Sequence, residues 1–148
     1  MGMSPAERVR ILREAIEDLT ASTKLKPDHP VPFYTLGLCL LDLAQKGDPF
    51  TEVLGPEADE ALAGFSRGLE LQPGMYQFHS LIGEVNHLKA IRSWEHGDDP
   101  EPLFDQAESS FEAAIRMNPD YVHPHINLAW VDYFRAKFDV RNLSLIHI

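Results

Sequence analysis

The chain has 148 residues, of which 44% are hydrophobic and 24% charged, and its formal net charge is −10. These values are typical of one globular domain. Residues 31–100 carry four Lys or Arg against eleven Asp or Glu. Because phosphate groups and anionic lipids are bound by clustered basic side chains, this acidic stretch argues against a nucleic-acid or membrane-surface partner. No apolar run reaches the length of a signal peptide or a membrane span, so we expect a cytoplasmic protein.

The positions of proline, glycine and capping residues, together with the spacing of apolar residues, predict six helices. Their expected ranges are 5–25, 32–46, 56–71, 75–96, 101–117 and about 121–139. Ser4 is placed to cap the first helix, with Pro5 at its first position and Glu7 in its first turn. Val9, Leu12, Ile16 and Leu19 recur at the three- and four-residue intervals of one helical face. No segment alternates every second residue as a half-buried strand does, so the fold class is all-α.

The same pattern of residues occurs three times. Pro27, Pro73 and Pro119 are spaced by 46 residues. Each follows an alanine by twelve residues, a large apolar residue by eight and a small residue by five: Ala15, Leu19 and Ser22, then Ala61, Phe65 and Gly68, then Ala107, Phe111 and Ala114. Self-similarity at such a period predicts a solenoid whose repeats bury their apolar faces against their neighbours.

The repeated residues resemble the tetratricopeptide (TPR) family. Leu36-Gly37 and Ile82-Gly83 stand where that family has Leu-Gly in the first helix of a pair, and the alanine, phenylalanine and proline follow in the second. The resemblance implies a right-handed superhelical array of antiparallel helix pairs, here residues 1–142 as one domain. Glycine at positions 37 and 83 would let paired helices approach closely, and the phenylalanines would fill the space between successive units.

The period departs from the family's usual length of about 34 residues. The additional residues fall between the glycine of the first helix and the alanine of the second. In the first unit they form the expected loop 47–55, and in the second they mostly extend the helix through Trp94, before the turn 97–100. HEAT repeats also have periods near this length, but they do not explain the Leu-Gly, Ala, Phe, Pro spacing. The long variant looks similar to arrays attached to some bacterial serine/threonine kinases, although the chain itself contains no kinase motif.

Residues 143–148 break the repeat pattern. They read Leu-Ser-Leu-Ile-His-Ile and correspond to the translation of a transposon end used in preparing sequencing libraries. We therefore expect a non-native tail, with the natural protein continuing where it begins.

The resemblance also implies a binding surface, because the first helices of successive repeats line a concave groove. The positions that repeat into it are Tyr34, Leu38, Leu41, Asp42, Gln77, Ser80, Glu84, His87, His123, Ile126, Asn127, Trp130 and Tyr133. Apart from Asn127, the Lys and Asn residues with which some family members grip a terminal carboxylate are missing. An aromatic and apolar groove suits a peptide or partner helix. The alternative is that further repeats cover this surface.

Few residues of the sequence suggest catalysis or metal binding. His79, His123 and His125 suggest a zinc site, but no cysteine or carboxylate set completes a tetrahedral centre. Cys39 is expected to be a buried, inert thiol. The sequence shows no nucleophile and base at a spacing typical of a catalytic pair, and no cofactor-binding motif. We therefore expect no catalytic activity, no bound metal and no cofactor. The sequence favours a protein-interaction scaffold. The alternatives are a regulatory segment of a larger signalling protein such as a bacterial kinase, and a metal-dependent enzyme using the histidines.

Overall fold

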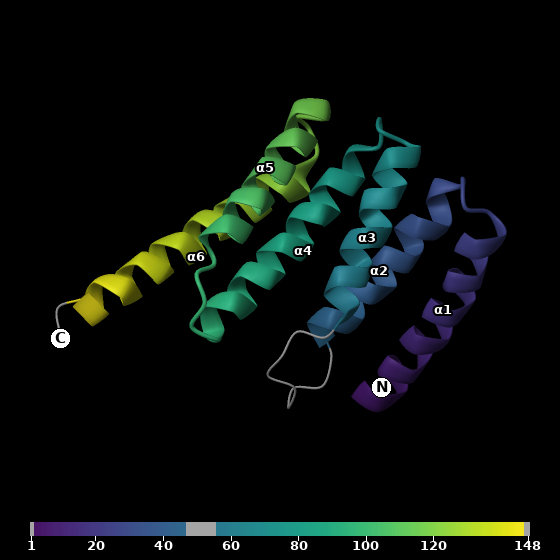
Figure 1. The fold of residues 1–148 in the computed structure, drawn as a ribbon, viewed down its shortest axis with the longest axis horizontal. Helices are drawn as coiled ribbons and strands as arrows, with labels where there is room; N and C mark the ends of the chain where they lie inside the picture. Colours follow the sequence, from purple (N-terminus) through teal and green to yellow (C-terminus); the bar gives the residue numbers. More distant parts are fainter. Residues whose placement is uncertain (1, 47–55, 147–148) are drawn as a thin grey trace. The chain divides into compact units, whose positions relative to one another are not determined.

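A computed structural model describes residues 2–46 and 56–146, with side chains through residues 45 and 139 of these two stretches. This part of the chain consists of six α-helices and their connections and contains no strand. The helices are labelled in chain order in Figure 1. They are α1 (Pro5–Leu25), α2 (Pro30–Lys46), α3 (Pro56–Leu71), α4 (Tyr76–Glu95), α5 (Glu101–Met117) and α6 (Val122–Ile146). The all-α fold with tandem helix pairs is confirmed. The expected loop 47–55 lies outside the described residues, and the right-handed superhelix stays a prediction.

Local chemistry explains where the helices begin and end. The Ser4 hydroxyl accepts a hydrogen bond from the Glu7 backbone N–H at 3.2 Å, which satisfies one of the free donors at the start of α1. The Asp99 carboxylate accepts from the Glu101 N–H at 3.0 Å in the same way at the start of α5. Gly97 between α4 and α5 has φ of +86°, a backbone conformation that glycine adopts without a steric penalty.

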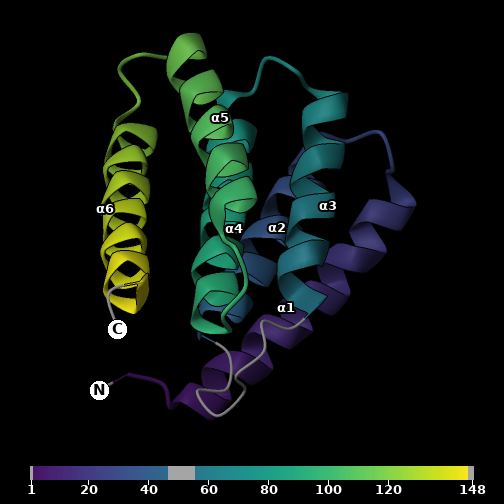
Figure 2. The ribbon, with the colours of Figure 1, turned by 60° about the vertical axis from the view of Figure 1, so that its left-hand side comes forward.

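The chain divides into two compact units, Met1–Phe78 and His79–Ile148, and each is described by itself. In the first unit α2 packs against both α1 and α3 (Figure 2). Ala61 and Phe65 of α3 are fully buried, and the Phe65 ring lies over Gly37 of α2. A Cβ atom built on Gly37 would stand 2.4 Å from the Phe65 ring, so the predicted close approach of the two helices is confirmed.

The second unit repeats this contact. Phe111 of α5 is fully buried against Gly83 of α4, where an added Cβ would meet its ring at 2.6 Å. Its core is completed by Ala90, Phe104, Ala107 and Val131. α5 packs against α6, and Arg135 of α6 ties the pair with ion pairs to three carboxylates of α5, those of Glu101, Asp105 and Glu108. Sequence reasoning missed this network.

Two details differ from expectation. α6 continues to Ile146 instead of ending near residue 139, because no glycine or proline follows Pro124 to interrupt it. Cys39 is only partly buried, and burial followed by the nearby Asp42 carboxylate raises the pKa of its thiol. Its thiolate form, the reactive one, is therefore disfavoured. No helix in the described stretches is both long enough and apolar enough to cross a bilayer.

Candidate partner-binding surface

The thirteen predicted surface residues lie on α2, α4 and α6, and their accessibility differs by residue. Leu41 and Ser80 are buried, at 4% and 0% exposure, so neither offers accessible surface to a partner. Those partly exposed are Tyr34, Leu38, Asp42, Gln77, Glu84, His87 and Asn127. His123, Ile126, Trp130 and Tyr133, all on α6, are exposed. The accessible part of the predicted set is therefore concentrated on α6.

A stripe of large apolar side chains runs along α6. Val122, Ile126, Trp130 and Tyr133 are 50–60% exposed and follow one another at intervals of four, four and three residues. Such intervals place the side chains on one helical face. The Trp130 and Tyr133 rings meet edge to face with centroids 5.7 Å apart, which fixes their relative orientation. We call these four residues the α6 stripe.

A polar pair connects α4 to α6 in the second unit. Asn127 Nδ2 donates to Glu84 Oε1 at 3.4 Å, a long hydrogen bond. The Glu84 side chain is partly buried, and this burial raises its carboxyl pKa, while the hydrogen bond from Asn127 and the nearby His123 act in the opposite direction. The structure thus holds a carboxylate in a site that disfavours its charge.

Replacing Glu84 with glutamine tests this balance. When folding raises the pKa of a group, the group stabilises the folded chain at a pH below its pKa in the unfolded chain. This stabilisation is lost as the pH rises through its pKa in the folded chain. Glu84→Gln removes the charge and keeps an acceptor for Asn127, so we expect up to ~1 kcal/mol of added stability at pH 7. In urea unfolding the gain should shrink at pH 4. The exposed Glu112→Gln is the matched control, and an equal gain there would contradict the assignment to Glu84.

Sequence reasoning also missed the aromatic environment of His87. Its ring centroid lies 6.0 Å from that of Phe104 on α5 and 5.5 Å from that of Phe134 on α6. Its Nε2 atom is buried without a hydrogen-bond partner in the described residues. Burial lowers the pKa of His87, so its imidazole is held neutral between the two rings.

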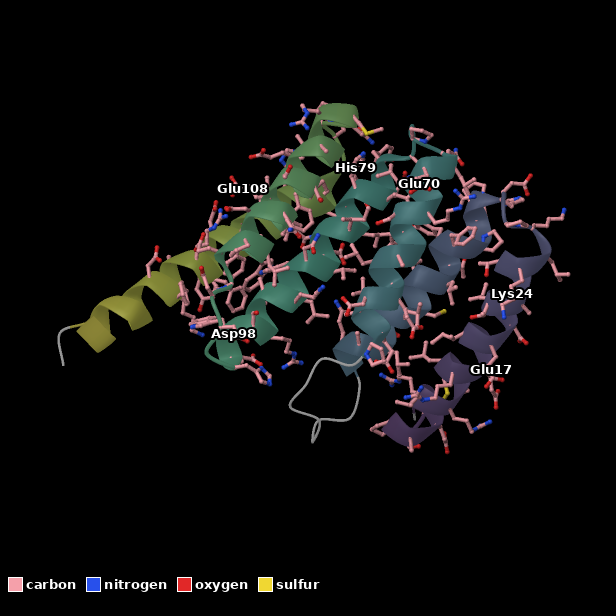
Figure 3. All side chains as sticks on the ribbon, viewed as in Figure 1. Glu17, Lys24, Glu70, His79, Asp98 and Glu108 are labelled. Atoms are coloured by element: carbon pink, nitrogen blue, oxygen red, sulfur yellow. The ribbon has the colours of Figure 1, made fainter. Side chains whose placement is uncertain are left out.

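Each of the three histidines considered for a metal site has its own surroundings in the structure. His79 is half-buried on α4, where burial and then Arg116 lower its pKa (Figure 3). His125 Nε2 lies 2.9 Å from the Pro119 carbonyl oxygen. The His123 ring meets Tyr121 edge to face at 5.3 Å. In the stretches that the structure describes, no three His, Cys, Asp or Glu side chains gather as metal ligands would.

Comparisons with known proteins bear on the fold alone. No family model matches the sequence, and no curated protein sequence matches it. A solved structure of a mutant O-GlcNAc transferase from Thermobaculum terrenum is similar over 88% of this chain, with a TM-score of 0.55 and 17% sequence identity. This chain spans 23% of the length of that one. Together with the six helices described above, the likeness defines an all-α helical repeat protein.

Proposed function

We propose that the chain is a non-catalytic scaffold of the TPR type that binds a peptide or helix of a partner protein along α6. The observation that carries this proposal is the α6 stripe, in which four large apolar side chains are about half exposed. Exposed aromatic residues that adjoin one another are typical of interaction sites, because they bury much apolar area at little cost in conformational entropy.

The spacing of the α6 stripe and the charge of the whole chain support one kind of partner. Apolar side chains at three- and four-residue intervals complement an amphipathic helix that presents its own apolar face. The chain's net charge of −10 favours basic residues flanking that face. The favoured ligand is therefore an apolar helical segment with Lys or Arg at its margins.

Selection from a displayed peptide library tests the proposal. Peptides enriched on the purified chain should share apolar residues at helical spacing. Their Kd, measured by calorimetry, should rise at least ~10-fold in Trp130→Ala, since truncating a central aromatic residue of an interface costs at least ~1.4 kcal/mol. The control is Met117→Ala, which removes another exposed apolar side chain, from α5. Enriched peptides without this pattern, or binding unchanged in Trp130→Ala, would contradict the proposal.

A second candidate is a helical-repeat segment within a longer enzyme or signalling protein. It is supported by the similar structure, of which this chain covers only 23%. Sequencing the uninterrupted gene tests this candidate directly. A reading frame that continues into a catalytic domain would support it, whereas a stop codon close to residue 142 with no domain upstream would contradict it.

A further inference from the structure

The two ends of the α6 stripe differ in charge. Lys137 follows Tyr133, the last residue of the stripe, by four residues and therefore continues the same helical face. Glu84 of α4 lies beside the N-terminal half of the stripe, because it accepts the hydrogen bond from Asn127, the residue after Ile126. Lys137 follows Asn127 by ten residues, which corresponds to about 15 Å along a helix. One acidic and one basic group thus stand about three helical turns apart along the stripe.

Aromatic rings hold the Lys137 ammonium group in place without neutralising it. Its Nζ atom lies 5.9 Å from each of three ring centroids, those of Trp94, Tyr133 and Phe134. This distance is within the range of a cation–π interaction. Lys137 is exposed, and no carboxylate of the described residues lies within ion-pair distance of it. Asp132 and Asp139 are five and two residues away, which places them on the opposite side of α6. An oriented cation is therefore available to an acidic group of a partner.

The Glu84 carboxylate has acceptor capacity that the chain leaves unused. Its one hydrogen bond in the described residues is the long one from Asn127, whereas two carboxylate oxygens can accept about four. No Lys or Arg of the described residues lies within ion-pair distance of Glu84, and the nearby His123 carries charge only when protonated. Burial raises the carboxyl pKa, and a cation placed beside the group would offset that penalty.

We propose that the α6 stripe binds an amphipathic partner helix in one orientation, with a Lys or Arg of the partner paired to Glu84 and an Asp or Glu paired to Lys137. The proposal rests on the proposed function and adds the order of charges along the ligand. The reverse orientation places like charges together at both ends, which disfavours it. The two charged residues of the ligand should be about ten positions apart, because both helices have the same rise per residue. The net charge of −10 favours further basic residues elsewhere on the ligand.

A displayed library of amphipathic helices with a fixed apolar face and randomised flanking positions provides the probe. Peptides enriched on the purified chain should carry a basic and an acidic residue about ten positions apart beside the apolar face. Calorimetry then measures the Kd of the most enriched peptide. Neutralisation should raise this Kd ~5-fold in Glu84→Gln and ~3-fold in Lys137→Gln, since Lys137 is the more exposed of the two.

Matched controls separate local pairing from overall charge. Glu112→Gln on α5 and Lys24→Gln on α1 remove exposed charges of the same two signs, and each should leave the Kd within ~2-fold of the parent value. Circular dichroism checks that each variant folds. Equal effects of the controls and of the two test variants would overturn the proposal, as would enriched peptides that lack the pair of opposite charges.

Double-mutant cycles determine the orientation. Replacing the basic residue of the peptide with glutamine should lose most of its effect in Glu84→Gln and keep it in Lys137→Gln, and the acidic residue should behave in the opposite way. Coupling in the crossed combinations would indicate the reverse orientation and overturn the proposal. Additive effects in all four cycles, with Trp130→Ala still weakening binding, would overturn the charge pairing and leave peptide binding at the stripe intact. Binding that Trp130→Ala does not change would contradict the proposed function itself, and the absence of any enriched peptide would contradict both.

Discussion

Gly37→Ala should destabilise the first unit by about 2–3 kcal/mol, near the upper end of what overpacking a core usually costs. The new methyl carbon would stand 2.4–2.7 Å from three atoms of the Phe65 ring. Phe65 is fully buried and meets the Phe78 ring at a centroid distance of 6.4 Å, so it cannot move aside without disturbing a second buried ring. Alanine favours a helix over glycine by about 1 kcal/mol, which offsets part of this cost.

Gly64→Ala is the matched control, since Gly64 is also buried and also lies in a helix of the same unit. A Cβ atom there would meet its nearest neighbour, the Phe33 carbonyl oxygen, at 3.5 Å, an ordinary contact. We therefore expect Gly64→Ala to be neutral or to stabilise by up to ~1 kcal/mol. Urea unfolding followed by circular dichroism measures both variants. Equal effects of the two substitutions would show that the contact with Phe65 does not decide the outcome.

The close approach of the paired helices could be predicted from the sequence, because Gly37 and Gly83 recur in one register. The contact of the phenylalanines was not predicted, since Phe65 and Phe111 were expected between successive units, whereas their rings lie over the glycines of their own pairs. The start of α1 was predictable from local chemistry, since Ser4 and Pro5 act through neighbouring backbone groups, whereas the end of α6 was not. Such local signals need no knowledge of how distant elements pack.

The accessibility of the candidate surface was less predictable. Periodicity places Leu41 and Ser80 on the same faces as Leu38 and Glu84, but it does not show how far neighbouring helices cover the edge of a face. Leu41 and Ser80 are covered, whereas Trp130 is not. The hydrogen bond between Glu84 and Asn127 was not predicted either, although both residues belong to the candidate surface. A repeat register relates equivalent positions, but it does not predict which non-equivalent side chains contact each other.

The Arg135 network had a signal in the sequence. Glu101, Asp105 and Glu108 follow one another by four and three residues, which lines three carboxylates along one face of α5. A cation on an adjacent helix reduces the repulsion within such a row of carboxylates, and Arg135 of α6 is that cation. The labelled Glu108 lies on α5 in Figure 3. Which basic residue of α6 meets the row depends on the rotation of that helix, which periodicity alone does not define.

His87→Leu should stabilise the second unit by about 1–2 kcal/mol at neutral pH, because it removes a buried ring nitrogen that has no hydrogen-bond partner in the described residues. Leucine also stands at the equivalent position of α2, where Leu41 is buried. The substituted side chain would keep the apolar contact with Phe104 and Phe134, whose rings flank His87.

The pH dependence makes the His87 prediction specific. Burial lowers the folded pKa of His87 below its usual value near 6.5, so the unfolded chain binds the proton more readily. The stability contribution of the neutral ring is therefore complete above that value and is lost as the pH falls below it toward the folded pKa. Of the groups that titrate nearby, Glu84 on the same helix acts in the opposite direction, because its pKa is raised. The advantage of His87→Leu should consequently grow between pH 7.5 and pH 5.5.

Tryptophan fluorescence isolates the unit concerned, because both tryptophans of the chain, Trp94 and Trp130, lie in the second unit. Urea midpoints measured this way at several pH values should be less pH-dependent in His87→Leu than in the parent chain. His125→Gln is the control, since it removes an exposed histidine from α6. If the parent and His87→Leu show the same dependence below pH 6.5, the buried ring is not the group that loses stability. A change confined to His87→Leu would establish that a neutral histidine occupies the core position that leucine holds in the preceding repeat.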